Sequence, residues 1–227
     1  MMKYSILLLC SSLFSFAAAQ NSPIGIFQYS SDIGSPKKAG SAVYNPSDQC
    51  YNIRGGGYNI WFERDEFQYL YNKIKGDFIL TANFAFVGKG TNAHRKTGWM
   101  VRGTTEDKSP HISATLHGDG LTVLQWRGEA GAAMRDPQDQ FFADSSWYNI
   151  VQVERSGKTI TMRAAHTGEP FTTIGSHLME NLPDEVLAGL FVCSHDPEVI
   201  EEARMWNVRI DKPVSDNFDP YKSGFLG

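Results

Sequence analysis

The most suggestive chemical group in the sequence is a short run of charged side chains, Glu63-Arg64-Asp65-Glu66. Cleavage of a glycosidic bond needs two carboxylates that flank the bond, and retaining enzymes hold them about 5–5.5 Å apart. In a regular strand Glu63 and Asp65 share one face and Glu66 points to the other, because side chains alternate. Asp65 and Glu66 are therefore candidate catalytic residues if a bulge interrupts the strand, and otherwise the run is a set of solvated strand charges.

A second group of candidates includes both ends of one predicted strand. Over residues 111–117 the odd-numbered residues are mostly polar and the even-numbered ones are apolar, so one face carries His111 and His117. Such a face suits sugar hydroxyls, a divalent metal or proton abstraction beside a keto group, and an ordinary solvent-exposed face explains it equally well. His117 is thus also a candidate catalytic residue. The candidate ligand-binding residues are Arg102, His111, His117, Trp126, Arg127 and His195.

Five tryptophans offer aromatic surfaces on which sugar rings could stack. Trp126 is predicted to be exposed because its neighbours Gln125 and Arg127 are polar, whereas Trp206 in the predicted closing strand is expected to be buried. Most large aromatic side chains of a β domain belong to its core, so we expect only one or two tryptophans to form a binding platform.

The sequence contains no pattern that assigns a metal ligand or a cofactor. No Cys/His pair has zinc spacing, and no EF-hand-like pattern or G-x-S-x-G nucleophile elbow is present. We therefore expect no cofactor. The alternative is a divalent metal such as calcium, bound through Asp119 or through the acidic residues of the polar insertion 128–146.

These candidates must be positioned by a many-stranded β domain. Short segments rich in β-branched and aromatic residues alternate with turn residues, and helix signals are almost absent apart from a predicted helical turn within 196–202. Packed as two antiparallel sheets, these segments predict an all-β sandwich. The predicted strands are 40–44, 50–54, 58–63, 67–74, 77–87, 97–102, 111–117, 121–127, 148–155, 158–166, 187–195 and 203–211.

The N-terminal segment 1–19 has the layout of a secretory signal peptide. A basic Lys3 precedes an apolar stretch that ends in Ala17-Ala18-Ala19. A membrane anchor is the alternative, but the apolar stretch is shorter than the roughly 20 residues that span a bilayer. We expect Sec export to the periplasm or cell exterior, with no membrane span in the mature chain. The predicted organisation continues with an irregular approach (20–39), one sandwich domain (40–212) and a tail or linker (213–227).

Charge and cysteine content exclude further classes of protein. The whole chain has a formal net charge of −4, and loss of Lys3 with the signal peptide makes the mature part more acidic. Nucleic acid is not an expected partner, because phosphate binding needs a concentrated basic face.

Cys50 and Cys193 are too few for a disulfide framework, and we expect them to be unpaired, with a single disulfide as the alternative.

Six segments of the predicted sandwich share their sequence pattern with a known class of domain. They are 51–61, Asp65-Glu66-Phe67, Gly76-Asp77-Phe78-Ile79-Leu80-Thr81-Ala82, Gly98-Trp99-Met100-Val101-Arg102, 189–196 and 206–210. These segments resemble bacterial concanavalin A-like domains of the lectin and glucanase type, which are also laminin-G-like. The likeness covers roughly residues 40–211. It is closest to the domain that precedes TolB-like propeller repeats in exported proteins, and more distant to the 3-keto-disaccharide hydrolase family.

This resemblance implies a two-sheet antiparallel jelly roll and an association with carbohydrate. Laminarinase-type glucanases of this fold carry E-x-D-x-x-E on one strand, and the present E-x-D-E departs from that spacing. The leading hypothesis is therefore an exported, non-catalytic module that binds a glycan or oligosaccharide. One alternative is an enzyme that cleaves glycosides or keto-disaccharides with the Asp65/Glu66 and Arg102/His117 region. A second is a structural module for a TolB-like propeller or another exported protein.

Overall fold

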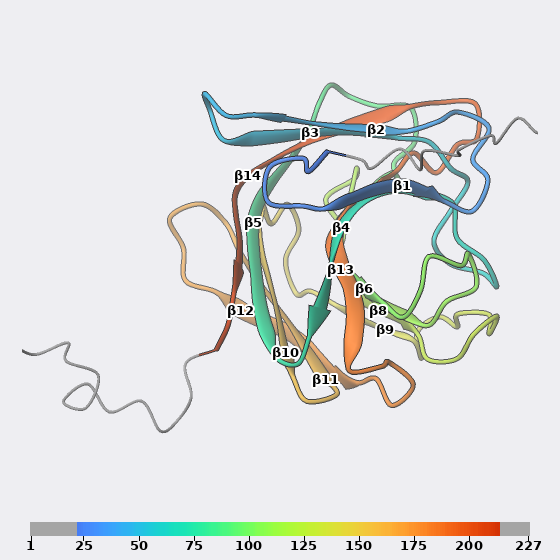
Figure 1. Cartoon of the computed structure of the whole chain (residues 1–227), viewed down its shortest axis with the longest axis vertical. Coiled ribbons are helices and arrows are strands. Elements are labelled where there is room, and N and C mark those ends of the chain that lie inside the picture. Colours follow the sequence, from blue (N-terminus) through green and yellow to red (C-terminus); the bar gives the residue numbers. More distant parts are fainter. Residues whose placement is uncertain (1–21, 214–227) are drawn as a thin grey trace, which may run out of the picture.

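The computed structural model describes residues 22–213, which contain fourteen β-strands (Figure 1). The predicted signal peptide, and the predicted tail from residue 214 onward, lie outside the described residues. The strands are β1 (Tyr29–Ile33), β2 (Ser41–Asn45), β3 (Cys50–Gly55), β4 (Phe67–Lys75), β5 (Phe78–Phe86), β6 (Lys96–Arg102), β7 (His111–His117), β8 (Thr122–Arg127), β9 (Gln140–Phe142), β10 (Ile150–Ser156), β11 (Thr159–Ala165), β12 (Thr172–Leu178), β13 (Glu185–Cys193) and β14 (Glu201–Asp211).

These strands form two seven-stranded sheets that pack face to face. The first sheet has the order β1-β4-β13-β6-β7-β8-β9, and the second has the order β12-β11-β10-β5-β14-β3-β2. Every strand pair is antiparallel, and strands from opposite halves of the chain are neighbours, such as the green β5 and the red β14 in Figure 1. The predicted fold class, a two-sheet antiparallel jelly roll, is confirmed. In the part of the chain that the structure describes, no helix is long and apolar enough to cross a membrane.

The main hydrophobic core lies between the two sheets. On β7 the apolar side chains Ile112, Ala114 and Leu116 belong to this core, which confirms the predicted alternation. Trp99 from the first sheet meets Phe84 from the second edge to face, with ring centroids 6.3 Å apart. Burial of these apolar side chains supplies the main driving force for folding.

The outer face of the first sheet is also buried. A second hydrophobic cluster on this face includes Phe67, Tyr69, Met100 and Phe191, and it is capped by Ile60 from the segment 56–66. For this reason all residues of β6, β7 and β8 are buried, although their sequences alternate. A sheet covered on both faces has no solvent-exposed polar side.

Close strand packing explains one glycine on this face. Gly98 has φ of 151°, and a Cβ at this position would lie 1.9 Å from the carbonyl oxygen of Ala114 on β7. Only glycine permits this approach without a shift of the backbone.

The structure differs from the predicted elements in five segments. The predicted strand 58–63 is a loop, because its apolar residue Ile60 inserts into the outer face of the first sheet instead of pairing in a ladder. The predicted turn within 196–202 contains bends and turns but no helix. Three strands were not predicted, namely β1 (within the supposedly irregular 20–39), β9 and β12. All three are edge strands, and each has one neighbour and little burial, so their sequences carry weak strand signals.

Cys50 and Cys193 are buried free thiols, as predicted. Burial raises the pKa of Cys193 to about 11. The thiol is therefore protonated at neutral pH and unreactive.

Candidate functional site

The predicted site residues separate into two groups at different ends of the first sheet. Arg102, His111 and Arg127 surround Asp65 at one end, and all four side chains are fully buried. His117 and His195 lie at the other end, near Lys96. The residues that we expected to share one polar face therefore lie in two separate environments.

Asp65 forms the centre of a buried ion-pair network. Its Oδ1 accepts a hydrogen bond from Arg127 Nη2 at 2.7 Å, and its Oδ2 accepts from Arg127 Nη1 at 2.9 Å and from Arg102 Nη1 at 3.3 Å. The two guanidinium groups also donate to the main-chain carbonyls of Phe62, Thr104, Glu106 and Ala132. The network thus ties three loops to the outer face of the first sheet.

His111 lies against this network without completing it. Its Nδ1 is 3.5 Å from Asp65 Oδ2, and neither ring nitrogen has a hydrogen-bond partner within the described residues. Burial lowers the pKa of His111 to about 3, although the Asp65 carboxylate opposes this shift. The imidazole is therefore neutral at physiological pH.

The geometry of Asp65 and Glu66 does not fit the predicted catalytic pair. Asp65 is 0% exposed, and both of its oxygens are engaged by arginines. Glu66 is paired with Arg64 and accepts a hydrogen bond from the main-chain nitrogen of Tyr58 at 3.3 Å. In this arrangement a substrate cannot reach the carboxylate of Asp65.

Trp126 faces the core, and the prediction that it is exposed is wrong. It is 5% exposed, and its ring stacks on His177 with centroids 3.8 Å apart. Its polar neighbours Gln125 and Arg127 point to the opposite face of the strand, which is itself covered. Trp206, predicted to be buried, is half-buried on β14.

Lys96 is buried beside two of the predicted histidines and is only 3% exposed. Its Nζ contacts Asn59 Oδ1 at 2.9 Å, the main-chain oxygen of His94 at 3.1 Å and His195 Nδ1 at 2.9 Å. Burial lowers the pKa of Lys96 to about 8, and burial together with this lysine lowers the pKa of His195 to about 4. Within residues 22–213 no carboxylate forms an ion pair with Lys96, which is unusual for a buried lysine.

An end cavity of about 280 Å³ opens next to His117, between the two sheets. Three of its lining side chains keep a buried polar atom that has no hydrogen-bond partner among the described residues: Arg95 Nε, His117 Nε2 and Asn149 Oδ1. Buried polar atoms almost always have partners, so this concentration around one cavity indicates a place for a polar ligand or ordered water. Arg95 is held in place by Glu201, whose Oε2 accepts from its Nη1 at 2.6 Å.

The rim of the end cavity carries the most exposed tryptophan of the described chain. Trp147 is 65% exposed and has φ of 66°, and its indole packs over Gly120. A Cβ at Gly120 would lie 2.5 Å from the indole, so a larger residue there would displace the ring. The cavity therefore joins an exposed aromatic surface to a few polar groups.

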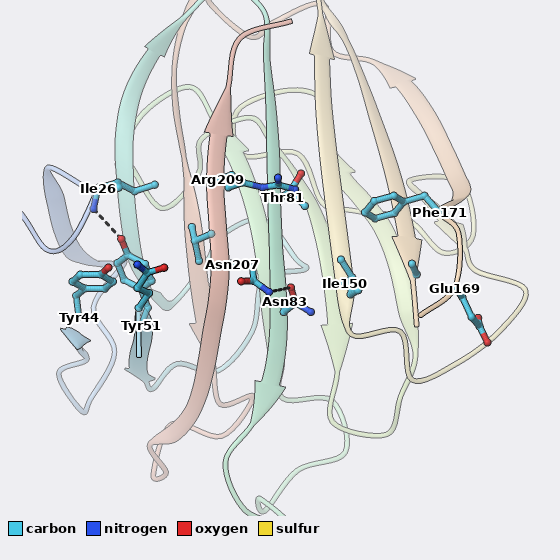
Figure 2. A pocket seen from close by; sticks show the side chains of 13 residues that line it. Ile26, Tyr44, Tyr51, Thr81, Asn83, Ile150, Glu169, Phe171, Asn207 and Arg209 are labelled. Atoms are coloured by element: carbon cyan, nitrogen blue, oxygen red, sulfur yellow. Dashed lines mark hydrogen bonds between the residues drawn. The ribbon is translucent and has the colours of Figure 1, made fainter. Parts of the chain in front are cut away.

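A larger groove of about 650 Å³ lies on the second sheet (Figure 2). Thr81 and Asn83 from β5 face Asn207 and Arg209 from β14, and Phe171 forms one wall. Asn207 occupies a β-bulge with φ of 52° and donates from Nδ2 to Asn83 Oδ1 at 3.2 Å. None of the unpartnered buried polar atoms belongs to this groove, so the end cavity is the better candidate site.

Sequence reasoning singled out His117 but missed its neighbours. Arg95, Lys96 and Asn149 lie directly before or at the start of a strand and give no periodic signal. Trp147 was recognised only as one of five tryptophans, although the preceding Asp144-Ser145-Ser146 already marks it as a loop residue.

The comparisons with known proteins define the class of fold. No family model and no curated protein sequence matches the chain. Similar solved structures include a functionally unknown protein from Saccharomyces cerevisiae (TM-score 0.57, 12% identity, 77% of this chain and 93% of that chain). They also include the GH43 protein BlXynB from Bacillus licheniformis (TM-score 0.52, 9% identity, 73% of this chain and 33% of that chain). A third is lectin II from Ulex europaeus (TM-score 0.51, 8% identity, 83% of this chain and 100% of that chain). The chain thus shares the two-sheet jelly-roll fold of these proteins, and it matches only a third of the BlXynB chain.

Replacement of the central carboxylate should destabilise the protein strongly. Asp65→Asn leaves two buried guanidinium groups without a counter-charge, so we expect the free energy of unfolding to fall by about 3–5 kcal/mol. Chemical denaturation measures this change. The control Glu63→Gln removes an exposed carboxylate of the same segment and should change stability by less than about 0.5 kcal/mol. Equal stabilities of the two variants would contradict the structural role of Asp65.

His111 should make stability depend on pH. Its folded pKa of about 3 lies below its unfolded value, so below about pH 6.5 the unfolded chain binds a proton that the folded protein does not. The free energy of unfolding therefore decreases as the pH is lowered. For this one side chain we expect it to decrease by about 2 kcal/mol from pH 7 to pH 5. Denaturation of His111→Gln over this range should show a shallower decline than the wild type. Parallel curves would show that His111 contributes nothing to the pH dependence.

Proposed function

We propose that the protein is an exported, non-catalytic carbohydrate-binding module whose glycan site is the end cavity below Trp147. The observation that carries this proposal is the coincidence of three unpartnered buried polar atoms with an exposed indole around one cavity. Proteins bind sugars through both kinds of contact, because a sugar ring has an apolar face and a rim of hydroxyl groups.

The unpartnered atoms match the chemistry of a polyol. Arg95 Nε is a donor, Asn149 Oδ1 is an acceptor, and His117 Nε2 takes either role according to its tautomer. A hydroxyl group both donates and accepts, so it can pair with any of the three atoms once a bound sugar displaces the side chains that cover them. A cavity of about 280 Å³ is smaller than the usual range for drug-sized ligands, and it suits one sugar residue. Further residues of an oligosaccharide would continue over Trp147.

The fold and the N-terminal sequence support the remaining parts of the proposal. One of the similar solved structures is a lectin complexed with galactose, so this sandwich architecture is compatible with glycan binding. Export rests on the signal-like layout of residues 1–19. The resemblance to domains that precede TolB-like propeller repeats supports an additional role beside a propeller or another exported protein.

An enzymatic function is the second candidate, and Lys96 is the observation that favours it. A buried lysine with a pKa of about 8, close to His117 and His195, suits a general base for proton abstraction beside a keto group. The Asp65/Glu66 pair does not support this alternative, because one carboxylate is inaccessible and the other is paired.

The glycan site can be tested with two aromatic variants. After a glycan array identifies a ligand, calorimetry should show that Trp147→Ala weakens binding by about tenfold or more, because the stacking surface is lost. Phe171→Ala is the matched control, since Phe171 is an exposed aromatic residue of the groove in Figure 2. Loss of affinity only in Phe171→Ala would move the site to the groove. A wild-type protein that binds no glycan would contradict the proposal and favour a structural module.

Catalysis can be tested on the same protein with keto-disaccharides. We expect no turnover of 3-keto-glucosides by the wild type, as measured by chromatographic detection of released sugar. Lys96→Met keeps the length of the side chain and removes its basic nitrogen. Turnover by the wild type that is abolished in a folded Lys96→Met variant would replace the binding module with the enzyme as the better hypothesis.

A further inference from the structure

Three potential metal ligands meet at the ends of the interior strands β6 and β7 of the first sheet, beside Lys96. His94 lies in the loop before β6, His117 ends β7, and Asp119 lies in the β7–β8 turn. One ligand atom from each of the three lies within 4.8 Å of the others. We propose that His94, His117 and Asp119 bind one Zn²⁺ ion, a role beyond the proposed glycan binding.

The separations between the ligand atoms fit a tetrahedral ion. Zinc binds imidazole nitrogen at about 2.0–2.1 Å, so two nitrogens on a tetrahedral ion lie about 3.3–3.4 Å apart. His94 Nδ1 and His117 Nδ1 are 3.4 Å apart, and His94 Nδ1 is 3.8 Å from Asp119 Oδ2. The ligand atoms of His117 and Asp119 lie within 4.8 Å of each other, so the exposed side chains of His94 and Asp119 must both shift to bring all three atoms to coordination distance.

The backbone holds the three residues in place before any ion binds. The main-chain nitrogen of Asp119 donates to Ala93 at 2.9 Å, and that of Gly118 donates to Arg95 at 3.0 Å. These two hydrogen bonds join the loop that carries His94 to the turn that carries Asp119. The main chain at the ends of β6 and β7 therefore brings the three residues together, and their side chains need only small adjustments.

The two carboxylate oxygens of Asp119 have different roles, one structural and one as a metal ligand. Asp119 Oδ1 accepts a hydrogen bond from the main-chain nitrogen of Leu121 at 3.1 Å, and Oδ2 is the oxygen nearest His94. Two imidazoles and one carboxylate are the ligand set of open zinc sites, which keep a fourth position for water or another ligand. Zinc is favoured over calcium, because calcium requires six to eight oxygen ligands.

This site can be separated from the glycan site. His117 belongs to both, but His94 and Asp119 do not line the end cavity, and Trp147 is not a ligand. Metal binding measured without sugar therefore tests only the zinc site. Trp147→Ala should retain the metal, and His94→Ala should retain the cavity.

Co²⁺ is the spectroscopic probe, and the purified chain is used without a histidine tag. We expect one Co²⁺ per chain with the visible absorption of a tetrahedral site, and displacement by Zn²⁺. His94→Ala and Asp119→Asn should each weaken binding by about tenfold or more, because each removes one of three ligands. His166→Ala is the matched control, since His166 is not one of the three ligands and contacts Glu169.

The outcome is decided by His94→Ala, which alters an exposed side chain and should leave the fold intact by circular dichroism. Absence of the tetrahedral absorption in the wild type would overturn the proposal. So would equal Zn²⁺ affinity of His94→Ala and the wild type in calorimetry.

Discussion

The buried ion pairs of Asp65 are the interaction on which the rest of the structure depends. One carboxylate pairs with two guanidinium groups, and these groups also donate hydrogen bonds to the carbonyls of three loops. Because a buried charge is costly unless it is paired, the three side chains require one another. The result is that the segment 56–66 is fixed on the outer face of the first sheet.

This closure decides where function can reside. The middle of the first sheet is covered by Ile60 and by the cluster around Phe67 and Phe191, so its polar residues stabilise loops and do not meet solvent. Other polar groups lie at one end of this covered face, close to solvent. There Lys96, His117 and Asn149 gather at the edge of the sandwich, and Trp147 stays exposed.

The two proposed sites share His117 and so share one structural origin. Both use the end of β7 and the loop before β6, and the zinc site adds the β7–β8 turn whereas the glycan site adds the segment before β10. Rigid strand ends position the side chains, and short turns add the remaining ligands. Such an arrangement places the proposed metal site directly beside the proposed glycan pocket, with one imidazole between them.

The sequence by itself determined the fold class, the central strands and the alternating face of β7, because apolar periodicity directly reflects burial between two sheets. It also identified Asp65, Arg102, His117 and their neighbours as unusual. It could not reveal the edge strands β1, β9 and β12, whose few contacts leave little pattern. Only the tertiary structure decided that the face bearing Arg102, His111 and Arg127 is covered, that Trp126 faces inward, and that His94 and Asp119 meet His117. These outcomes depend on which loop packs against which face, and such long-range contacts leave no local periodicity in the sequence.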